Sequence, residues 1–254
     1  MPGNSDPYLE QINLENDILN VDAALSQRRE RGPALAYGVG VRFCSRRGSV
    51  TLKSYIALEP KRGDKSLLLH VCCGPCAIMP ITRLLDEGFA VTAWFMNPNV
   101  QPLAEYLRRR EAAGECAARL GVDILYADET WDITAWLRAV AGRDEVPARC
   151  VYCCESRVEA TFAKAASLGF AWVSTSLLYS RYQPHEVIAA AGRRLAAPGG
   201  PGFVYRDFRT DWQAGIDRSK DWGLYRQPYC GCVYSEAERY RKKLELCKKE
   251  ATRH

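Results

Sequence analysis

The chain of 254 residues lacks long hydrophobic runs and a recognisable export signal. No stretch reaches the roughly 18 consecutive apolar residues that a membrane-spanning helix needs. The first residues, MPGNSDPYLEQINLEND, are polar and acidic where a signal peptide would be basic and then apolar. We therefore expect a protein of the cytoplasm with no membrane partner.

Common nucleotide-binding motifs are missing as well. The sequence has neither G-x-x-x-x-G-K-[ST] nor a G-x-G-x-x-G between a strand and a helix. A P-loop ATPase and a Rossmann dinucleotide enzyme are therefore not indicated. A nucleotide-dependent sulfur transferase would carry S-G-G-x-D-S at its first loop, and the chain does not.

Cysteine, by contrast, is abundant, with eleven residues. Reducing compartments disfavour structural disulfides, so clustered thiols there favour metal or redox chemistry. Most of the cysteines fall into three groups: Cys72, Cys73 and Cys76; Cys150, Cys153 and Cys154; Cys230 and Cys232. The solitary cysteines are expected to be ordinary packing or surface thiols: Cys44, Cys116 and Cys247.

Strand-like and helix-like segments alternate from residue 66 onward. The apolar fraction of 47% supports a substantial core, and strands separated by helices predict a three-layer α/β domain with a parallel sheet. Ligands bind such sheets beyond the carboxyl ends of the strands, which is where Cys72 and Cys73 fall. The predicted strands are 66–71, 89–96, 122–128 and 170–178, and the predicted helices are 77–88, 102–121, 131–142, 150–169 and 185–196.

The two ends of the chain differ from this pattern. Residues 1–65 are predicted to form a separate N-terminal extension, with a hairpin between 34–43 and 48–58, and residues 66–254 the α/β domain. From residue 202 the sequence is aromatic and polar, which predicts a folded flap. A helix is expected to follow it, with Ser235 as its N-cap and Glu238 completing a capping box.

The first two cysteine groups suit a polynuclear metal centre better than one zinc ion. Side chains of adjacent residues usually diverge, so Cys72 and Cys73 are expected to reach two different metal atoms. The thiolates of an iron–sulfur cluster bind several irons of one body. Cys150 and Cys153 share a face at the start of a helix, whose N-terminus favours thiolates. Two thiolates from each group would make a four-ligand set.

Two further cysteines of these groups have open roles. Cys76 could hold a further metal in the same crevice, or it could be a reactive residue of the first helical turn. Cys154 lies one position off the face shared by its neighbours and is expected to pack.

Cys230-Gly231-Cys232 is a different kind of site. C-x-C is too short for a relaxed disulfide loop, so a bond there would be easily reduced and suited to passing two electrons. The alternative is half of another metal site.

Two titratable residues complete the candidates. Asp207 in YRDFR could bind metal, or donate a proton if burial raises its pKa; a surface ion pair is the alternative. His70 lies inside the first strand and is expected to be a core histidine.

Basic residues gather in a few places, although the formal charge is only +5. Tyrosines interleave with the last basic stretch, a combination that nucleic acid would use. A solvated basic helix is the alternative. The basic stretches are Arg108–Arg110, Arg193 and Arg194, and the tail from Arg239 to His254.

Several motifs together resemble the QueH family of epoxyqueuosine reductases. They are HVCCGPC, the NPN turn followed by EYLRR, RCVYC, STSLLYSRYQ, YRDFR and YRQPYCGCVYS, in this order. The resemblance runs from about residue 66 to about residue 240, and residues 1–65 lie outside it. It implies a Rossmann-like fold of HUP type, so that residues 66–254 form a QueH-like metalloenzyme domain.

The resemblance also implies a reaction and a cofactor. The reaction is reduction of epoxyqueuosine to queuosine at the wobble position of tRNA, with a [4Fe-4S] cluster and an electron donor that the sequence does not identify. The implied cluster ligands are Cys72, Cys73, Cys150 and Cys153.

Other parts of the site follow by the same resemblance. The implied redox-active disulfide is Cys230–Cys232. Some relatives have aspartate where this chain has Cys76, beside a second metal, so an adjacent mononuclear iron is a further expectation. From the residues themselves, and not from the resemblance, we expect Asp207 to deliver protons, and Arg108–Arg110 with the basic tail to hold the anticodon arm through its phosphates. The alternative function is a zinc-stabilised RNA-binding module without catalysis.

Overall fold

The computed structural model describes residues 63–251, with side chains up to residue 249. The predicted N-terminal extension, except for its last three residues, and the predicted hairpin therefore lie outside the described residues. The described part confirms the predicted fold class, an α/β domain with a parallel sheet.

In the described part of the chain the sheet has five parallel strands, in the order β3-β2-β1-β4-β5. Four of them match the predicted strands, and the fifth was missed because two residues carry no readable periodicity. The strands are β1 (Ser66–Val71), β2 (Ala90–Phe95), β3 (Asp123–Tyr126), β4 (Trp172–Thr175) and β5 (Gly202–Phe203).

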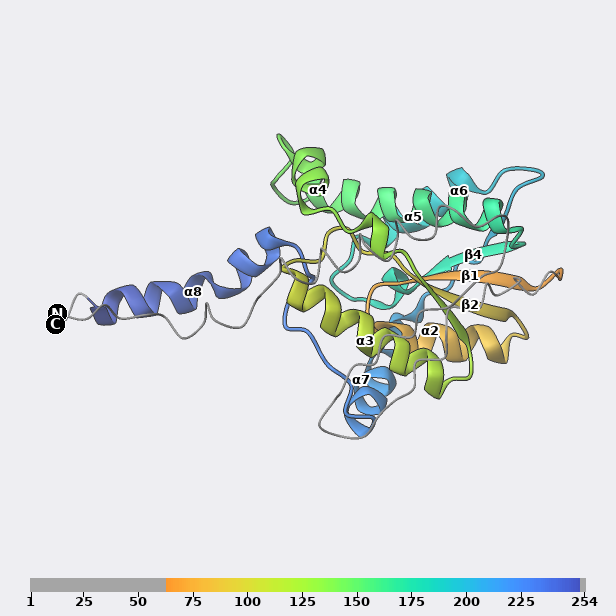
Figure 1. Cartoon of the computed structure of the whole chain (residues 1–254), viewed down its shortest axis with the longest axis horizontal. Coiled ribbons are helices and arrows are strands. Elements are labelled where there is room, and N and C mark those ends of the chain that lie inside the picture. Colours follow the sequence, from red (N-terminus) through yellow and green to blue (C-terminus); the bar gives the residue numbers. More distant parts are fainter. Residues whose placement is uncertain (1–62, 252–254) are drawn as a thin grey trace, which may run out of the picture. The chain divides into compact units, whose positions relative to one another are not determined.

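Helices cover both faces of the sheet, which gives the three predicted layers. In Figure 1, α5 and α6 lie over one face, and α2 and α3 lie over the other. The helices are α2 (Gly74–Asp86), α3 (Leu103–Arg119), α4 (Ile133–Val140), α5 (Ala148–Leu168), α6 (His185–Leu195), α7 (Trp212–Asp221) and α8 (Val233–Ala251). Short 3₁₀ helices are Asp128–Thr130, Ser176–Tyr179 and Phe208–Asp211.

β1 is the central strand, and its sequence explains that position. Leu67, Leu68 and Leu69 are consecutive apolar residues, and none of them is exposed to solvent. A strand covered on both faces requires such a run, whereas a strand with one wet face would alternate. Because β1 is central, the loop that follows it opens at the middle of the carboxyl edge of the sheet.

The predicted flap contains more regular structure than its sequence suggested. It includes α7, which was missed because WQAGIDRSKD has a central glycine and no clear apolar periodicity. The expectation of Ser235 as N-cap was wrong, because α8 begins two residues earlier. Cys232 occupies the capping place: its Sγ accepts a hydrogen bond from Ser235 N (3.4 Å), and its carbonyl accepts one from Ser235 Oγ (2.8 Å).

None of the helices in the described part of the chain combines the length and the apolar character that crossing a membrane would require.

The start of α2 fits against α3 so closely that only glycine is accommodated at residue 74. A Cβ there would lie 2.3 Å from the carbonyl oxygen of Ala112, a backbone atom that cannot move aside cheaply. Because overpacking typically costs about 1–3 kcal/mol, we expect Gly74→Ala to lower the free energy of unfolding by an amount near the upper end of that range.

The measurement is the urea midpoint, with Gly200→Ala as the matched control. At residue 200 the nearest heavy atom would be 3.6 Å away, which is an ordinary contact. Equal midpoints for the two variants would contradict this account of the α2–α3 packing.

Candidate metal centre

The first thiol group is formed by the loop between β1 and α2. Cys73 is the N-cap of α2, and its Sγ accepts a hydrogen bond from Cys76 N at 3.4 Å. The sulfur atoms of Cys72, Cys73 and Cys76 all lie within 4.8 Å of one another. Three thiols this close can hold a metal ion together.

The geometry of this loop overturns one expectation from the sequence. The sulfurs of Cys72 and Cys73 lie 3.9 Å apart, so the expected divergence of these neighbouring side chains was wrong. Cys73 has left the strand and capped the helix, which turns its sulfur back over the first turn of α2, where it approaches both Cys72 and Cys76. Cys76 therefore belongs to this thiol group by position.

The second thiol group lies in the first turn of α5. This helix packs against β1 and β4, the two neighbouring strands at the centre of the sheet. Cys150 is partly buried and Cys153 is buried, one turn apart as predicted. Cys154 is buried too, and its thiol donates to Gln183 Oε1 at 3.3 Å, so it packs as expected.

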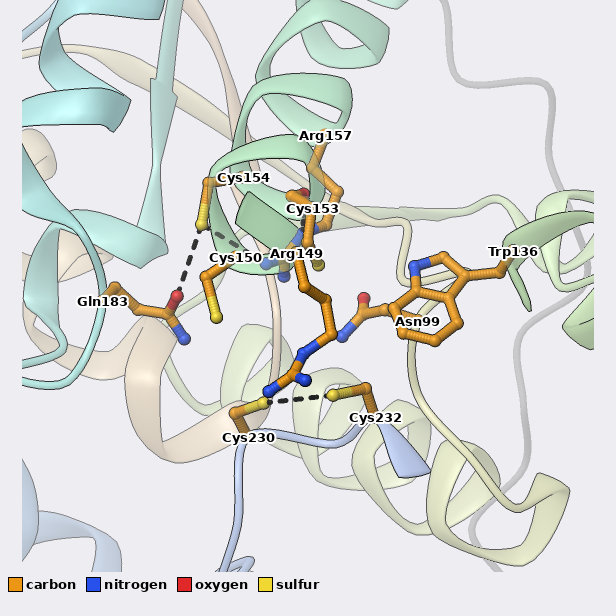
Figure 2. Close-up of a pocket in the computed structure, with 10 residues that line it drawn as sticks. All are labelled: Asn99, Trp136, Arg149, Cys150, Cys153, Cys154, Arg157, Gln183, Cys230 and Cys232. Atoms are coloured by element: carbon orange, nitrogen blue, oxygen red, sulfur yellow. Dashed lines mark hydrogen bonds between the residues drawn. The ribbon is translucent and has the colours of Figure 1, made fainter. Parts of the chain in front are cut away.

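The third group, Cys230 and Cys232, faces the thiols of α5 across a recess. Figure 2 shows the sulfurs of these two residues on one side of the recess and the α5 cysteines on the other. Both residues are free thiols, with their sulfurs 3.9 Å apart. The recess is lined by Asn99, Trp136, Arg149, Cys150, Cys153, Cys154, Arg157, Gln183, Cys230 and Cys232.

A buried arginine fixes the loop that carries the third group. Arg109, only 1% exposed, donates to the carbonyls of Cys230 (2.8 Å) and Tyr229 (3.0 Å) and pairs with Glu105 (2.7 Å). Gly231 has φ +124° and would bring a Cβ within 2.9 Å of Arg109 Nη1. The loop is therefore held against α3 by its backbone, which leaves its two thiols directed into the recess.

The three arginines Arg108–Arg110 were expected to bind phosphates together, and this expectation was wrong. Consecutive helical residues point to different faces, so Arg108 alone of the three is classed as exposed. Arg109 is buried, and Arg110 is half-buried and pairs with Asp128 at 2.9 Å.

Two of the thiol groups combine thiols of opposite acidity. Hydrogen bonds from Cys73 and Cys76 hold the pKa of Cys72 well below its usual value, while burial raises the pKa of Cys73. A hydrogen bond from Cys232 lowers the pKa of Cys230 to about 5, and the same bond raises the pKa of Cys232. Each of these groups thus favours one thiolate stabilised by neighbouring thiols.

The structure gives Asp207 an arginine partner. Its carboxylate accepts hydrogen bonds from Arg209 Nε (2.8 Å) and Nη2 (2.6 Å), which lower its pKa to about 2. Asp207 does not line the recess. The ion pair that was the alternative for this residue is present, and proton delivery by Asp207 stays a prediction.

His70 is a core residue in this structure. It has no exposed surface, and its ring nitrogens lie 2.9 Å from Thr175 Oγ1 and 3.0 Å from Met96 O. Burial lowers its pKa to about 4, so the ring is neutral near pH 7.

Several residues of the site were not singled out from the sequence. Gln227 Nε2 donates to Cys73 Sγ at 2.9 Å, and Asn99 and Trp136 line the recess. Asn99 and Gln227 lie in the NPN and YRQPYCGCVYS motifs, which could have drawn attention to them, whereas nothing in the sequence around Trp136 marks it. Arg157 was detectable, because it follows Cys153 by four residues and so shares its helical face.

Comparisons with known proteins identify the family of the chain. Residues 67–238 match the family model described as epoxyqueuosine reductase QueH. The epoxyqueuosine reductase QueH of Dehalococcoides mccartyi is 35% identical over 176 residues, covering 69% of this chain and 95% of that protein. The protein of the same name from Thermotoga maritima is 35% identical over 190 residues, covering 72% and 97%.

A solved structure gives a weaker likeness, on which no conclusion rests. It is the U34-tRNA thiolase NcsA from Methanococcus maripaludis with its [4Fe-4S] cluster, at 13% identity and a TM-score of 0.47, covering 74% of this chain and 68% of that one. The sequence matches are sufficient by themselves. They show that the chain belongs to the QueH family of epoxyqueuosine reductases, which are oxidoreductases.

Proposed function

We propose that this protein reduces epoxyqueuosine to queuosine in tRNA, using a metal centre built from the thiols at the carboxyl edge of the sheet. The reaction breaks both C–O bonds of the epoxide, forms a C=C bond, consumes two electrons and two protons, and releases the oxygen as water. The observation that carries the proposal is that the recess combines thiols of α5 with those of the Cys230–Cys232 loop. The three thiols that follow β1 do not line the recess but form a compact group at the same carboxyl edge of the sheet. Family membership supports the choice of reaction.

The donor atoms at this edge fit an iron–sulfur cluster. The group of possible metal ligands in the described part of the chain consists of cysteines alone, and soft thiolates select iron–sulfur clusters or zinc over hard cations. We assign Cys72, Cys73, Cys150 and Cys153 as the ligands of a [4Fe-4S] cluster. Cys76, within 4.8 Å of two of them, would be available to an adjacent iron.

A bound cluster would supply single electrons at low potential and an iron that can act as a Lewis acid. The chain supplies the remaining parts of the reaction. Cys230 and Cys232 can release two electrons and two protons by forming a disulfide, for which their sulfurs must close from 3.9 Å. Proton delivery by Asp207 would require its ion pair with Arg209 to open.

The proposed reaction also implies a tRNA-binding surface, an electron donor and a cellular compartment. An epoxyqueuosine reductase acts on tRNA, and we propose that α8 binds the phosphates of the anticodon arm. Residues 237–249 of α8 are all exposed. A separate electron donor must reload the centre after each turnover. The described cysteines form no disulfides, which is consistent with the reducing cytoplasm that we propose for this protein.

The proposed reaction is tested with reduced, metal-reconstituted protein and tRNA that contains epoxyqueuosine. Mass spectrometry of the nucleosides should show the loss of one oxygen atom, with conversion to queuosine. Protein that contains a redox-active cluster and leaves epoxyqueuosine unchanged would contradict the proposal. So would colourless protein that holds stoichiometric zinc and is inactive.

A series of Cys→Ser variants separates the proposed ligands from the proposed dithiol. Replacement of any ligand should lower the bound iron and the absorbance near 400 nm, because a cluster corner loses its thiolate. Replacement of Cys230 or Cys232 should leave the iron content unchanged and lower turnover at least tenfold. The exposed Cys247 is the matched control, and its serine variant should keep the wild-type iron content and the wild-type turnover.

Either half of this assignment can fail separately. Full iron content after replacement of Cys150 or Cys153 would exclude that residue as a ligand. Loss of iron after replacement of Cys230 or Cys232 would show that these two thiols bind the metal, which is the alternative that the sequence left open.

Charge reversal on α8 tests the tRNA contact. We expect R241E/K242E/K243E to weaken tRNA binding at least tenfold near 0.1 M salt and to reduce the slope of log K against log salt, because phosphate contacts release counterions. The matched control is K65E/K164E/K220E, which changes the same charge just before β1, on α5 and on α7. Equal weakening by both triples would show that net charge, and not α8, attracts the tRNA.

A further inference from the structure

Arg157 is a buried cation beside the cysteines of α5. Arg157 lies on α5 and is only 4% exposed to solvent. Its Nε donates to the carbonyl of Cys153 at 2.9 Å, and its Nη2 lies 3.9 Å from the sulfur of Cys154. Figure 2 shows Arg157 beside Cys153 at the edge of the recess.

Within the part of the chain that the structure describes, Arg157 lacks the acidic partner that a buried arginine normally has. Within the described residues, no Asp or Glu oxygen lies within 4.0 Å of the Arg157 guanidinium. The other buried arginines of the site do have such partners: Arg109 pairs with Glu105 (2.7 Å) and Arg149 with Glu238 (2.8 Å). Among residues 63–249, Arg157 therefore differs from Arg109 and Arg149 in having no carboxylate partner.

A guanidinium cannot escape this problem by losing its proton, because arginine stays charged in proteins. A buried charge without a counter-charge is strongly unfavourable. The groups whose negative charge would act on Arg157 are thiols from all three groups: Cys153, Cys154, Cys72 and Cys230. Cys72 and Cys153 are the proposed metal ligands among them, and a bound cluster would hold both as thiolates whatever their pKa.

We propose that Arg157 is the counter-charge of the metal–thiolate centre and raises its reduction potential. The inference rests on the proposed function, because it presupposes that these thiols hold a redox-active cluster. One-electron reduction makes such a centre more negative by one charge. A fixed cation nearby stabilises the reduced form more than the oxidised form, and in a dry site this attraction is large.

Arg157 would also orient a ligand. Its hydrogen bond to the Cys153 carbonyl lies on the helical turn that carries that thiol. This makes Arg157 a positioning residue as well as a charge, and the two roles can be separated by comparing lysine with glutamine at this place.

The experiment is a potentiometric titration of the reconstituted full chain, followed by electron paramagnetic resonance. The variants are Arg157→Gln, which removes the charge, and Arg157→Lys, which keeps it. Lys164→Gln, on the same helix, removes one charge away from the thiols and is the matched control.

At the wild-type midpoint potential, we expect the ratio of reduced to oxidised cluster to fall at least tenfold in Arg157→Gln. For a one-electron couple, this corresponds to a midpoint about 59 mV more negative. Arg157→Lys and Lys164→Gln should keep midpoints close to the wild-type value.

Each outcome decides the question. An unchanged midpoint in Arg157→Gln would overturn the inference. Loss of the cluster in both Arg157 variants would also overturn it, because the hydrogen bonds and not the charge would then be required. Loss of the cluster in Arg157→Gln with retention in Arg157→Lys would support it. A wild-type protein without a redox-active cluster would instead refute the proposed function itself.

Discussion

The geometry of a parallel sheet brings together thiols that are far apart in the sequence. β1 and β4 are neighbours at the centre of the sheet, and α5 packs against both. The loop after β1 and the first turn of α5 therefore lie at the carboxyl edge, where such sheets bind ligands. The Cys230–Cys232 loop is held at this edge by the Arg109 side chain, which donates hydrogen bonds to two backbone carbonyls of the loop. If either α5 or that loop were displaced, the recess would lose its cysteines.

Charge is the second condition that the site must meet. Arg109 and Arg157 are both almost fully buried beside thiols, although arginine is rarely buried without a partner. Glu105 compensates one of them, and the proposed metal–thiolate centre would compensate the other. The buried charges of the chain and the chemistry of its family thus lead to the same conclusion, that an anionic group belongs at this edge.

The sequence predicted the parts of the structure that depend on periodic burial. The apolar run of β1, the alternation of strands and helices, and the pairing of Cys150 with Cys153 on one face were all readable. β5, α7 and the true start of α8 were not, because they are short or fixed by tertiary contacts. The separation of Arg109 from Arg108 was also missed, although helical geometry requires it. The approach of Cys72 to Cys73 depends on a cap conformation that composition does not encode.

The central claim is that the loop after β1 and the first turn of α5 hold one cluster between them. The most direct measurement is an anomalous diffraction map, at the iron edge, of crystals of the reconstituted protein. The account predicts a single group of iron atoms bonded to sulfurs of Cys72, Cys73, Cys150 and Cys153, close to the Arg157 guanidinium. Metal bound by Cys72, Cys73 and Cys76 alone, with the thiols of α5 unbound, would contradict it.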